Sequence, residues 1–112
     1  MFDNSINVAR REQVYFNYSE ALKKAERLEA IAEEINSRIY NDLSEKLDYG
    51  RNVWKSDTAN IYFDKYNKIV NDLKECARNY KRVAEVIRTT AKRNYDAEIR
   101  IIEIASKRVY KN

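Results

Sequence analysis

The chain has 112 residues, which is the length of a single domain. It contains one glycine and no proline, and 36% of its residues are charged. Turns between strands need glycine and proline, so this composition excludes a fold with many strands and is typical of long helices or coiled coils. Lys and Arg total 22 and Asp and Glu total 18, which gives a net charge of +4. Because the charges are interspersed, they indicate a solvated helix exterior more than a nucleic-acid surface.

The residue types that carry most chemistry are scarce. The chain has no histidine and one cysteine, Cys76, whose helical neighbours Leu73 and Tyr80 are apolar. This pattern favours a small packed thiol over a nucleophile, because a catalytic cysteine usually needs a base beside it. No metal-ligand spacing and no glycine-rich phosphate loop is present. We therefore expect no catalytic residue, no metal site and no cofactor.

The first 20 residues contain charges and no apolar block, which is not the pattern of a cleavable signal peptide. No stretch approaches the roughly 18 apolar residues that a membrane span needs. We expect no membrane span, and any export would not use a cleavable signal peptide.

Apolar residues follow a helical period from about residue 10 to 48. Two lines of residues seven apart share one stripe: Val14, Ala21, Leu28 and Ile35, then Tyr18, Ala25, Ala32 and Ile39. Beyond Ile39 the spacing changes to steps of four at Leu43 and Leu47. This change suits a nearly straight helix rather than a long supercoil.

A second helix is predicted from about residue 57 to 95, with a helical arm continuing to about residue 110. Its two lines are Phe63, Val70, Ala77, Ala84 and Ala91, and Tyr66, Leu73, Tyr80 and Ile87. One line is mostly alanine, so a neighbouring helix can approach closely on that side.

The segment from about residue 49 to 56 should turn the chain. Gly50 follows the first apolar stripe, where a left-handed C-cap belongs, and Ser56 or Asp57 can cap the next helix. The result is one antiparallel helical hairpin domain spanning residues 1–112. With the turn centred near residue 53, residue 11 should face residue 95. The arm beyond residue 95 would then lack a partner within the chain, and it carries Ile99, Ile101, Ile102, Ile104 and Val109.

The apolar stripe of the second helix is wider than two helices require, because apolar residues come in adjacent pairs such as Ile69 with Val70 and Val83 with Ala84. The simplest way to cover it is a second hairpin in a four-helix bundle, as a homodimer or heterodimer. The predicted hairpin and dimer contacts are Leu28, Ile35, Ile39, Tyr66, Val70, Leu73, Ala77, Tyr80, Ala84, Ile87 and Ala91.

The turn and the helix start carry a resemblance. Trp54-Lys55-Ser56 is followed by Ala59 and then by Tyr62 and Phe63. This arrangement resembles the WXG family, small substrates of type VII secretion systems, in which a Trp-x-Gly triplet lies in the turn of a helical hairpin. The resemblance implies a turn read by the secretion ATPase through Trp54 and Ser56, and packing at the helix start by the three residues that follow.

Two departures from the family pattern matter. Ser56 replaces the glycine of the triplet, but serine is a good N-cap and so preserves the helix start. The family also carries Tyr-x-x-x-Asp/Glu after the second helix, and here Tyr95 has its acid, Glu98, one residue early. Two interpretations of Tyr95 and Glu98 stay open: a coincidence in a chain with nine tyrosines, or a degenerate form of this signal whose second half the partner carries.

The resemblance implies a protein made in the bacterial cytoplasm and secreted without a cleavable signal peptide. It would be an effector or a companion of another small helical hairpin protein or of the helical N-terminal domain of a larger toxin. The alternatives are a cytoplasmic helical adaptor and, less favoured, a basic nucleic-acid binder.

Overall fold

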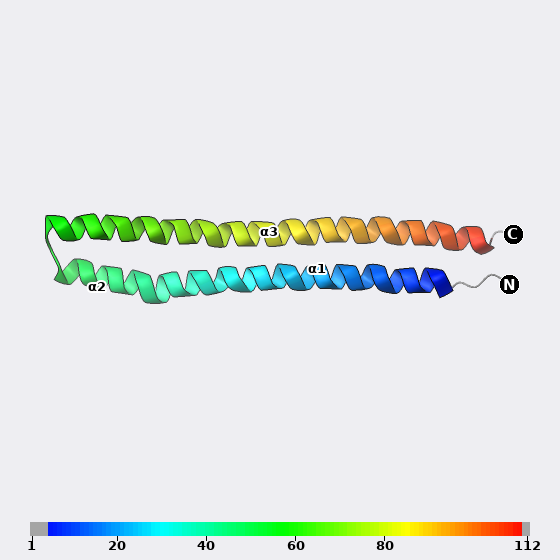
Figure 1. Cartoon of the computed structure of the whole chain (residues 1–112), viewed down its shortest axis with the longest axis horizontal. Coiled ribbons are helices and arrows are strands. Elements are labelled where there is room, and N and C mark those ends of the chain that lie inside the picture. Colours follow the sequence, from blue (N-terminus) through cyan, green and yellow to red (C-terminus); the bar gives the residue numbers. More distant parts are fainter. Residues whose placement is uncertain (1–4, 111–112) are drawn as a thin grey trace. The chain divides into compact units, whose positions relative to one another are not determined.

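The computed structural model describes the backbone of residues 5–110 and the side chains of residues 5–108. Four helical elements follow one another: α1 (Ser5–Arg38), the π-helix η1 (Ile39–Ser44), α2 (Glu45–Val53) and α3 (Asp57–Tyr110). Only Trp54, Lys55 and Ser56 separate α2 from α3 (Figure 1). The described residues contain no strand, so the all-α prediction is confirmed.

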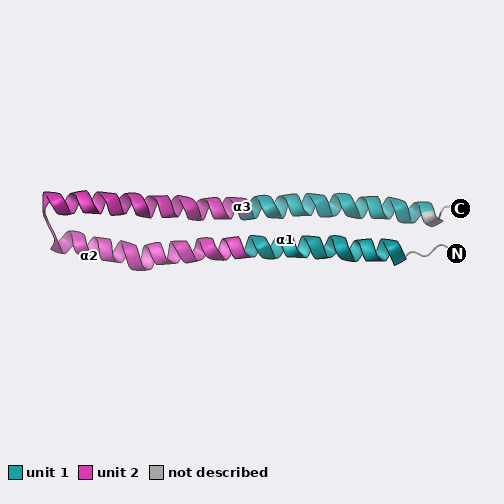
Figure 2. Ribbon diagram, in the orientation of Figure 1, with its two compact units in different colours: residues 1–26, 84–112 teal, residues 27–83 magenta. Residues whose placement is uncertain are grey.

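The chain divides into two compact units, and α1 and α3 each contribute to both (Figure 2). Unit 1 combines residues 1–26 with residues 84–112, and unit 2 is formed by residues 27–83. In both units the two helical segments run in opposite directions. The predicted antiparallel helical hairpin is therefore what the structure contains.

Small side chains line the contact between the helices. The most buried positions in unit 2 include Ala32, Ala59 and Ala77, each at most 1% exposed, together with Ile39 at 1%. In unit 1, Ala25 and Ala84 are fully buried. Because alanine projects little beyond the backbone, two helices lined with it can pack closely. Many of the larger apolar side chains, such as Tyr66 and Ile69, are left partly exposed on the flanks of the contact.

The predicted register was wrong. In unit 1 the ring of Tyr18 packs on Tyr95. The turn predicted from the sequence had placed residue 11 opposite residue 95. In unit 2 Glu33 faces Lys81. The error comes from the turn, because α2 continues to Val53 and the predicted turn of residues 49–56 shrinks to three residues.

The predicted uncovered arm is also corrected. Helix α1 begins at Ser5 rather than near residue 10, and Ile102 is only 3% exposed. A cavity is lined by Val14 and Gln13 on one side and by Ile101 and Ile102 on the other. The N-terminal turns of α1 therefore cover Ile102, whereas Ile101 and Ile104 of the same arm remain 61% and 47% exposed. The side chain of Val109 lies outside the described residues.

Gly50 does not form the predicted left-handed cap. No described glycine has a positive φ, and Gly50 lies within α2. A Cβ atom at this position would lie 3.2 Å from Cε1 of Phe63. The glycine therefore allows the Phe63 ring to approach the backbone of α2, which is a packing role rather than a turn role.

The change of spacing after Ile39 coincides with the π-helix. Segment η1 begins at the buried Ile39 and contains the half-buried Leu43. A π-bulge shifts the phase of a helix. A different set of the residues that follow it then faces the partner helix. Leu43 and Leu47 both remain half-buried across this change.

The close alanine contact predicts a specific sensitivity. We expect Ala77→Leu to lower the free energy of unfolding by about 1–3 kcal/mol, because the added atoms would push the two helices apart. Ala30→Leu is the matched control, since Ala30 is exposed in the same unit and leucine is nearly as good a helix former. Urea unfolding followed by circular dichroism measures both. Equal stabilities for the two variants would contradict the close packing at Ala77.

Candidate helix-binding face

The turn gathers the residues that carry the family resemblance. The Trp54 ring stacks on Tyr62 and meets Phe63 edge-on, with both centroids at 6.0 Å. Arg51 precedes the turn and Phe63 follows it, and the Arg51 guanidinium lies 5.9 Å from the centre of the Phe63 ring. Trp54 nevertheless remains 49% exposed. The turn is thus a packed aromatic cluster that still presents its tryptophan.

Ser56 starts α3 as the sequence predicts. Its Oγ accepts a hydrogen bond from the backbone N–H of Ala59 at 3.0 Å, and its carbonyl accepts one from Asn60 at 3.0 Å. The first of these satisfies a free donor at the helix N-terminus. Ser56 is therefore the N-cap, and Asp57 is the first residue of α3.

The predicted contact residues separate into layers by burial. The buried members in unit 2 are Ile39, Val70 and Ala77, joined at the helix start by Ala59 and Phe63. Half-buried members of unit 2 are Leu28, Ile35, Leu73 and Tyr80. Tyr62 and Tyr66 are exposed. In unit 1, Ala84 is buried and Ile87 and Ala91 are half-buried.

Ten of the half-buried and exposed apolar residues of unit 2 follow one regular spacing. Starting from Tyr62, steps of four and three residues alternate along α3 as far as Val83. The same alternation relates Leu28, Ile31 and Ile35 on α1. We call these residues the outer face of unit 2: Tyr62, Tyr66, Ile69, Leu73, Cys76, Tyr80 and Val83 with Leu28, Ile31 and Ile35.

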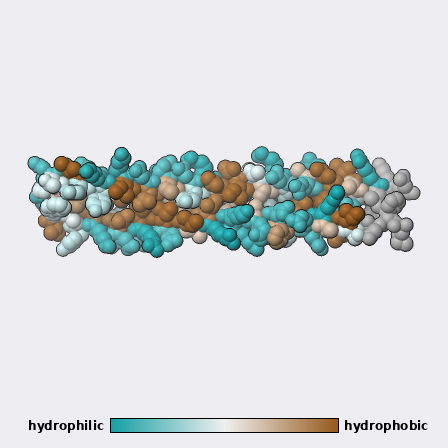
Figure 3. Space-filling model, in the orientation of Figure 1, coloured by the Kyte–Doolittle hydropathy of each residue, from teal (hydrophilic) through white to brown (hydrophobic). Residues whose placement is uncertain are grey.

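Several members of this face remain accessible. Tyr66, Ile69 and Val83 are each about half exposed, at 50%, 51% and 49%. A shallow hollow of about 220 Å³ lies between the two helices and is lined by Leu28, Cys76 and Tyr80 among others. In Figure 3, hydrophobic side chains gather along the middle of unit 2, between hydrophilic edges. The outer face of unit 2 is therefore an exposed apolar surface. The sequence indicated it only through the excess width of the apolar stripe on the second helix.

The opposite flank of α3 in unit 2 is polar. Lys81 and Lys74 lie on the other side of Ala77 from Leu73 and Tyr80, by the helical period. Lys81 Nζ is 2.8 Å from Glu33 Oε1, and Lys74 Nζ lies 4.6 Å above the ring of Tyr40. These contacts bridge the two helices in water. Unit 2 therefore has one apolar flank and one flank with charged residues.

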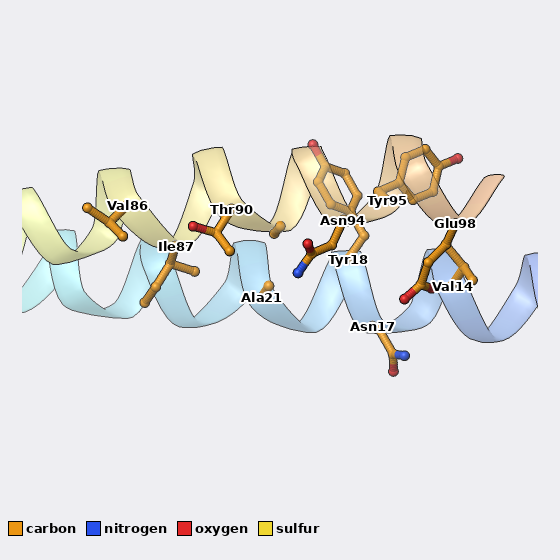
Figure 4. A pocket seen from close by; sticks show the side chains of 11 residues that line it. Val14, Asn17, Tyr18, Ala21, Val86, Ile87, Thr90, Asn94, Tyr95 and Glu98 are labelled. Carbon is orange, nitrogen blue, oxygen red and sulfur yellow. The ribbon is translucent and has the colours of Figure 1, made fainter. Parts of the chain in front are cut away.

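Unit 1 contains a groove rather than a continuous apolar surface. A cavity of about 480 Å³ lies between α1 and α3, bordered by Ala21 and Ile87 at one end and Glu98 at the other (Figure 4). A second cavity, of about 240 Å³, shares Val14, Asn17 and Glu98 with the first. The two cavities together are the unit 1 groove, and polar side chains interrupt its apolar lining.

The proposed C-terminal signal residues both belong to this unit. Tyr95 is half-buried, with its ring centroid 4.9 Å from that of Tyr18. Lys92 Nζ lies 5.5 Å from the Tyr95 ring and 3.0 Å from Asp96 Oδ1. This hydrogen bond to Asp96 and the nearby carboxylate charge raise the pKa of Lys92. Tyr95 is therefore engaged in packing, whereas Glu98 opens onto the groove.

Residues 5–110 offer no sign of metal chemistry or of a membrane segment. No group of three or more His, Cys, Asp or Glu residues able to hold a metal ion occurs among the described residues. None of the described helices is long and apolar enough to cross a membrane. The outer face of unit 2 and the unit 1 groove are the surfaces that remain as candidate sites.

The chain matches no known protein family model, no curated protein and no solved structure.

Sequence reasoning did not identify the unit 1 groove. Its polar residues Asn17, Thr90 and Asn94 are individually unremarkable in sequence, and only the register of the helices brings them together. The signal that was available is the spacing of Ile87, Thr90 and Asn94, which continues the alternation along α3.

The N-cap at Ser56 gives a test of the turn. We expect Ser56→Ala to lower the free energy of unfolding by about 1 kcal/mol, because the N–H of Ala59 loses its acceptor. Ser56→Asp should retain stability, since aspartate caps equally well and suits the helix N-terminus. Thermal and urea unfolding of the three proteins would measure this. An equal loss in both variants would show that the hydroxyl does not act as a cap.

Proposed function

We propose that this protein works by binding another helical hairpin through the outer face of unit 2, in a homodimer or a heterodimer with a four-helix core. The observation that carries this proposal is the alternation of four and three residues along that face. Such spacing is the pattern by which one helix packs its side chains between those of another. A lipid surface or a small ligand does not require it.

The particular role that we propose rests on the family resemblance. It is that of a type VII secretion substrate, or of a companion that helps to deliver itself or a larger toxin to the secretion ATPase. The Trp54 turn supports this role, because the tryptophan is held by Tyr62 and Phe63 and still half exposed. The packing of Tyr95 on Tyr18 favours a companion whose partner supplies the second half of the signal.

A charge placed on the outer face should prevent association. We expect wild-type protein to scatter light as a particle larger than 13.4 kDa, alone or with its partner. Ile69→Asp should weaken this association at least roughly a hundredfold, because an unpaired carboxylate would be buried in the interface. The matched control is Asn71→Asp, which adds the same charge at an exposed position of the same helix.

Cys76 provides a second measurement of the same interface. The thiol belongs to the outer face and is half-buried within one chain. Maleimide should therefore modify Cys76 faster in Ile69→Asp than in wild type or Asn71→Asp. A wild-type protein that stays at the mass of one chain at every concentration, alone and with co-expressed neighbours, would rule out the proposed function.

The secretion role makes its own prediction. In a bacterium with a type VII system that exports this protein, Trp54→Ala should abolish export, because the exposed part of the aromatic cluster is removed. Val53→Ala is the control, since Val53 is the exposed neighbour at 66% and lies outside the cluster. Circular dichroism should show the same helix content for both. Unchanged export of folded Trp54→Ala would reject the secretion role and leave the helix-binding role intact.

A further inference from the structure

The unit 1 groove has the dimensions of a helix-binding site. Its lining residues on α3 run from Val86 in the first cavity to Ile102 in the second. At a rise of 1.5 Å per residue this stretch spans about 24 Å, or more than four helical turns. A small ligand would occupy only one part of such a groove.

Two polar side chains on α3 face this groove without partners. Asn94 and Glu98 are one turn apart, and neither forms a hydrogen bond or an ion pair with the residues that the structure describes. Glu98 lines both cavities, and Figure 4 shows it beside the buried Val14 in the first of them. Arg10 lines the second cavity but makes no ion pair with Glu98. The carboxylate is therefore not neutralised within the described part of the chain.

The other polar groups in and beside the groove do not neutralise the charge of the Glu98 carboxylate. Asn17 Oδ1 already accepts a hydrogen bond from Gln13 Nε2 at 2.9 Å. Lys92, the cation closest to the Tyr18 and Tyr95 rings, is held by Asp96. If an apolar helix covered the groove, Glu98 would lose water and gain nothing in return, which is strongly unfavourable.

We propose that the unit 1 groove selects a partner helix that carries a lysine or arginine opposite Glu98. This inference rests on the proposed function, because it specifies the chemistry of the same helical partner. The long side chain of the cation packs its methylene groups on Val14, which lies beside Glu98, and places its charge at the carboxylate. Asn94 accepts a further hydrogen bond. Polar groups at one level of an otherwise apolar helix contact fix its register and reject wrong partners.

The test uses two synthetic helical peptides of four heptads with apolar a and d positions. They are identical except for one central a position, which is lysine in the first and glutamate in the second. Fluorescence anisotropy measures their dissociation constants with wild type, Glu98→Gln, Glu98→Lys and the control Glu103→Lys. Glu103 is exposed on the same helix and lines neither cavity.

We expect wild type to prefer the lysine peptide by about tenfold, equivalent to 1.4 kcal/mol. This preference should disappear in Glu98→Gln, reverse in Glu98→Lys and persist in Glu103→Lys. Equal binding of the two peptides to wild type, or an unchanged preference in Glu98→Gln, overturns the inference but leaves helix binding in place. A wild-type protein that binds neither peptide and remains a monomer overturns the inference together with the proposed function.

Discussion

The close contact between alanine-lined helices is the constraint from which the other features of this protein follow. Ala32 with Ala77 in unit 2, and Ala25 with Ala84 in unit 1, are almost completely buried. Such small side chains allow the backbones to approach, but they remove little apolar area from water, and hydrophobic stabilisation scales with that area. Each unit therefore holds its two helical segments together with a narrow contact and leaves many of its larger apolar side chains half-buried or exposed.

The placement of those larger side chains gives unit 2 two different flanks. One flank carries Ile69, Leu73 and Tyr80 with the spacing of a coiled-coil contact, and the other bears bridging cations such as Lys81. Scattered exposed apolar residues are ordinary on protein surfaces, whereas a row of them with helical spacing marks an interaction surface. The asymmetry thus connects the narrow core to the proposed function, in which a second hairpin would supply the area that the alanines cannot.

Unit 1 is also an antiparallel pair of helices, but polar residues occupy the positions that are apolar in unit 2. The spacing that is apolar along unit 2 reaches Thr90 and Asn94 on α3, and Glu98 lies one turn further. Polar groups in a helix contact add little affinity, but a wrong partner would leave them buried without hydrogen bonds. An apolar face for affinity and a polar groove for selectivity together suit a protein whose partner must be recognised among many similar helices.

The sequence by itself determined the class of fold, the two lines of apolar residues, an N-cap at Ser56 or Asp57 and the excess width of the stripe on α3. These features depend on neighbours within one or two helical turns, which the sequence displays directly. It could not determine how the helices align, because a shift of the turn by a few residues changes every pairing along them. The chain continued as helix through Gly50, which sequence rules assigned to a cap but which packs against Phe63. Only the tertiary structure therefore decided that Tyr18 meets Tyr95, that Ile102 is covered, and that a groove opens around Glu98.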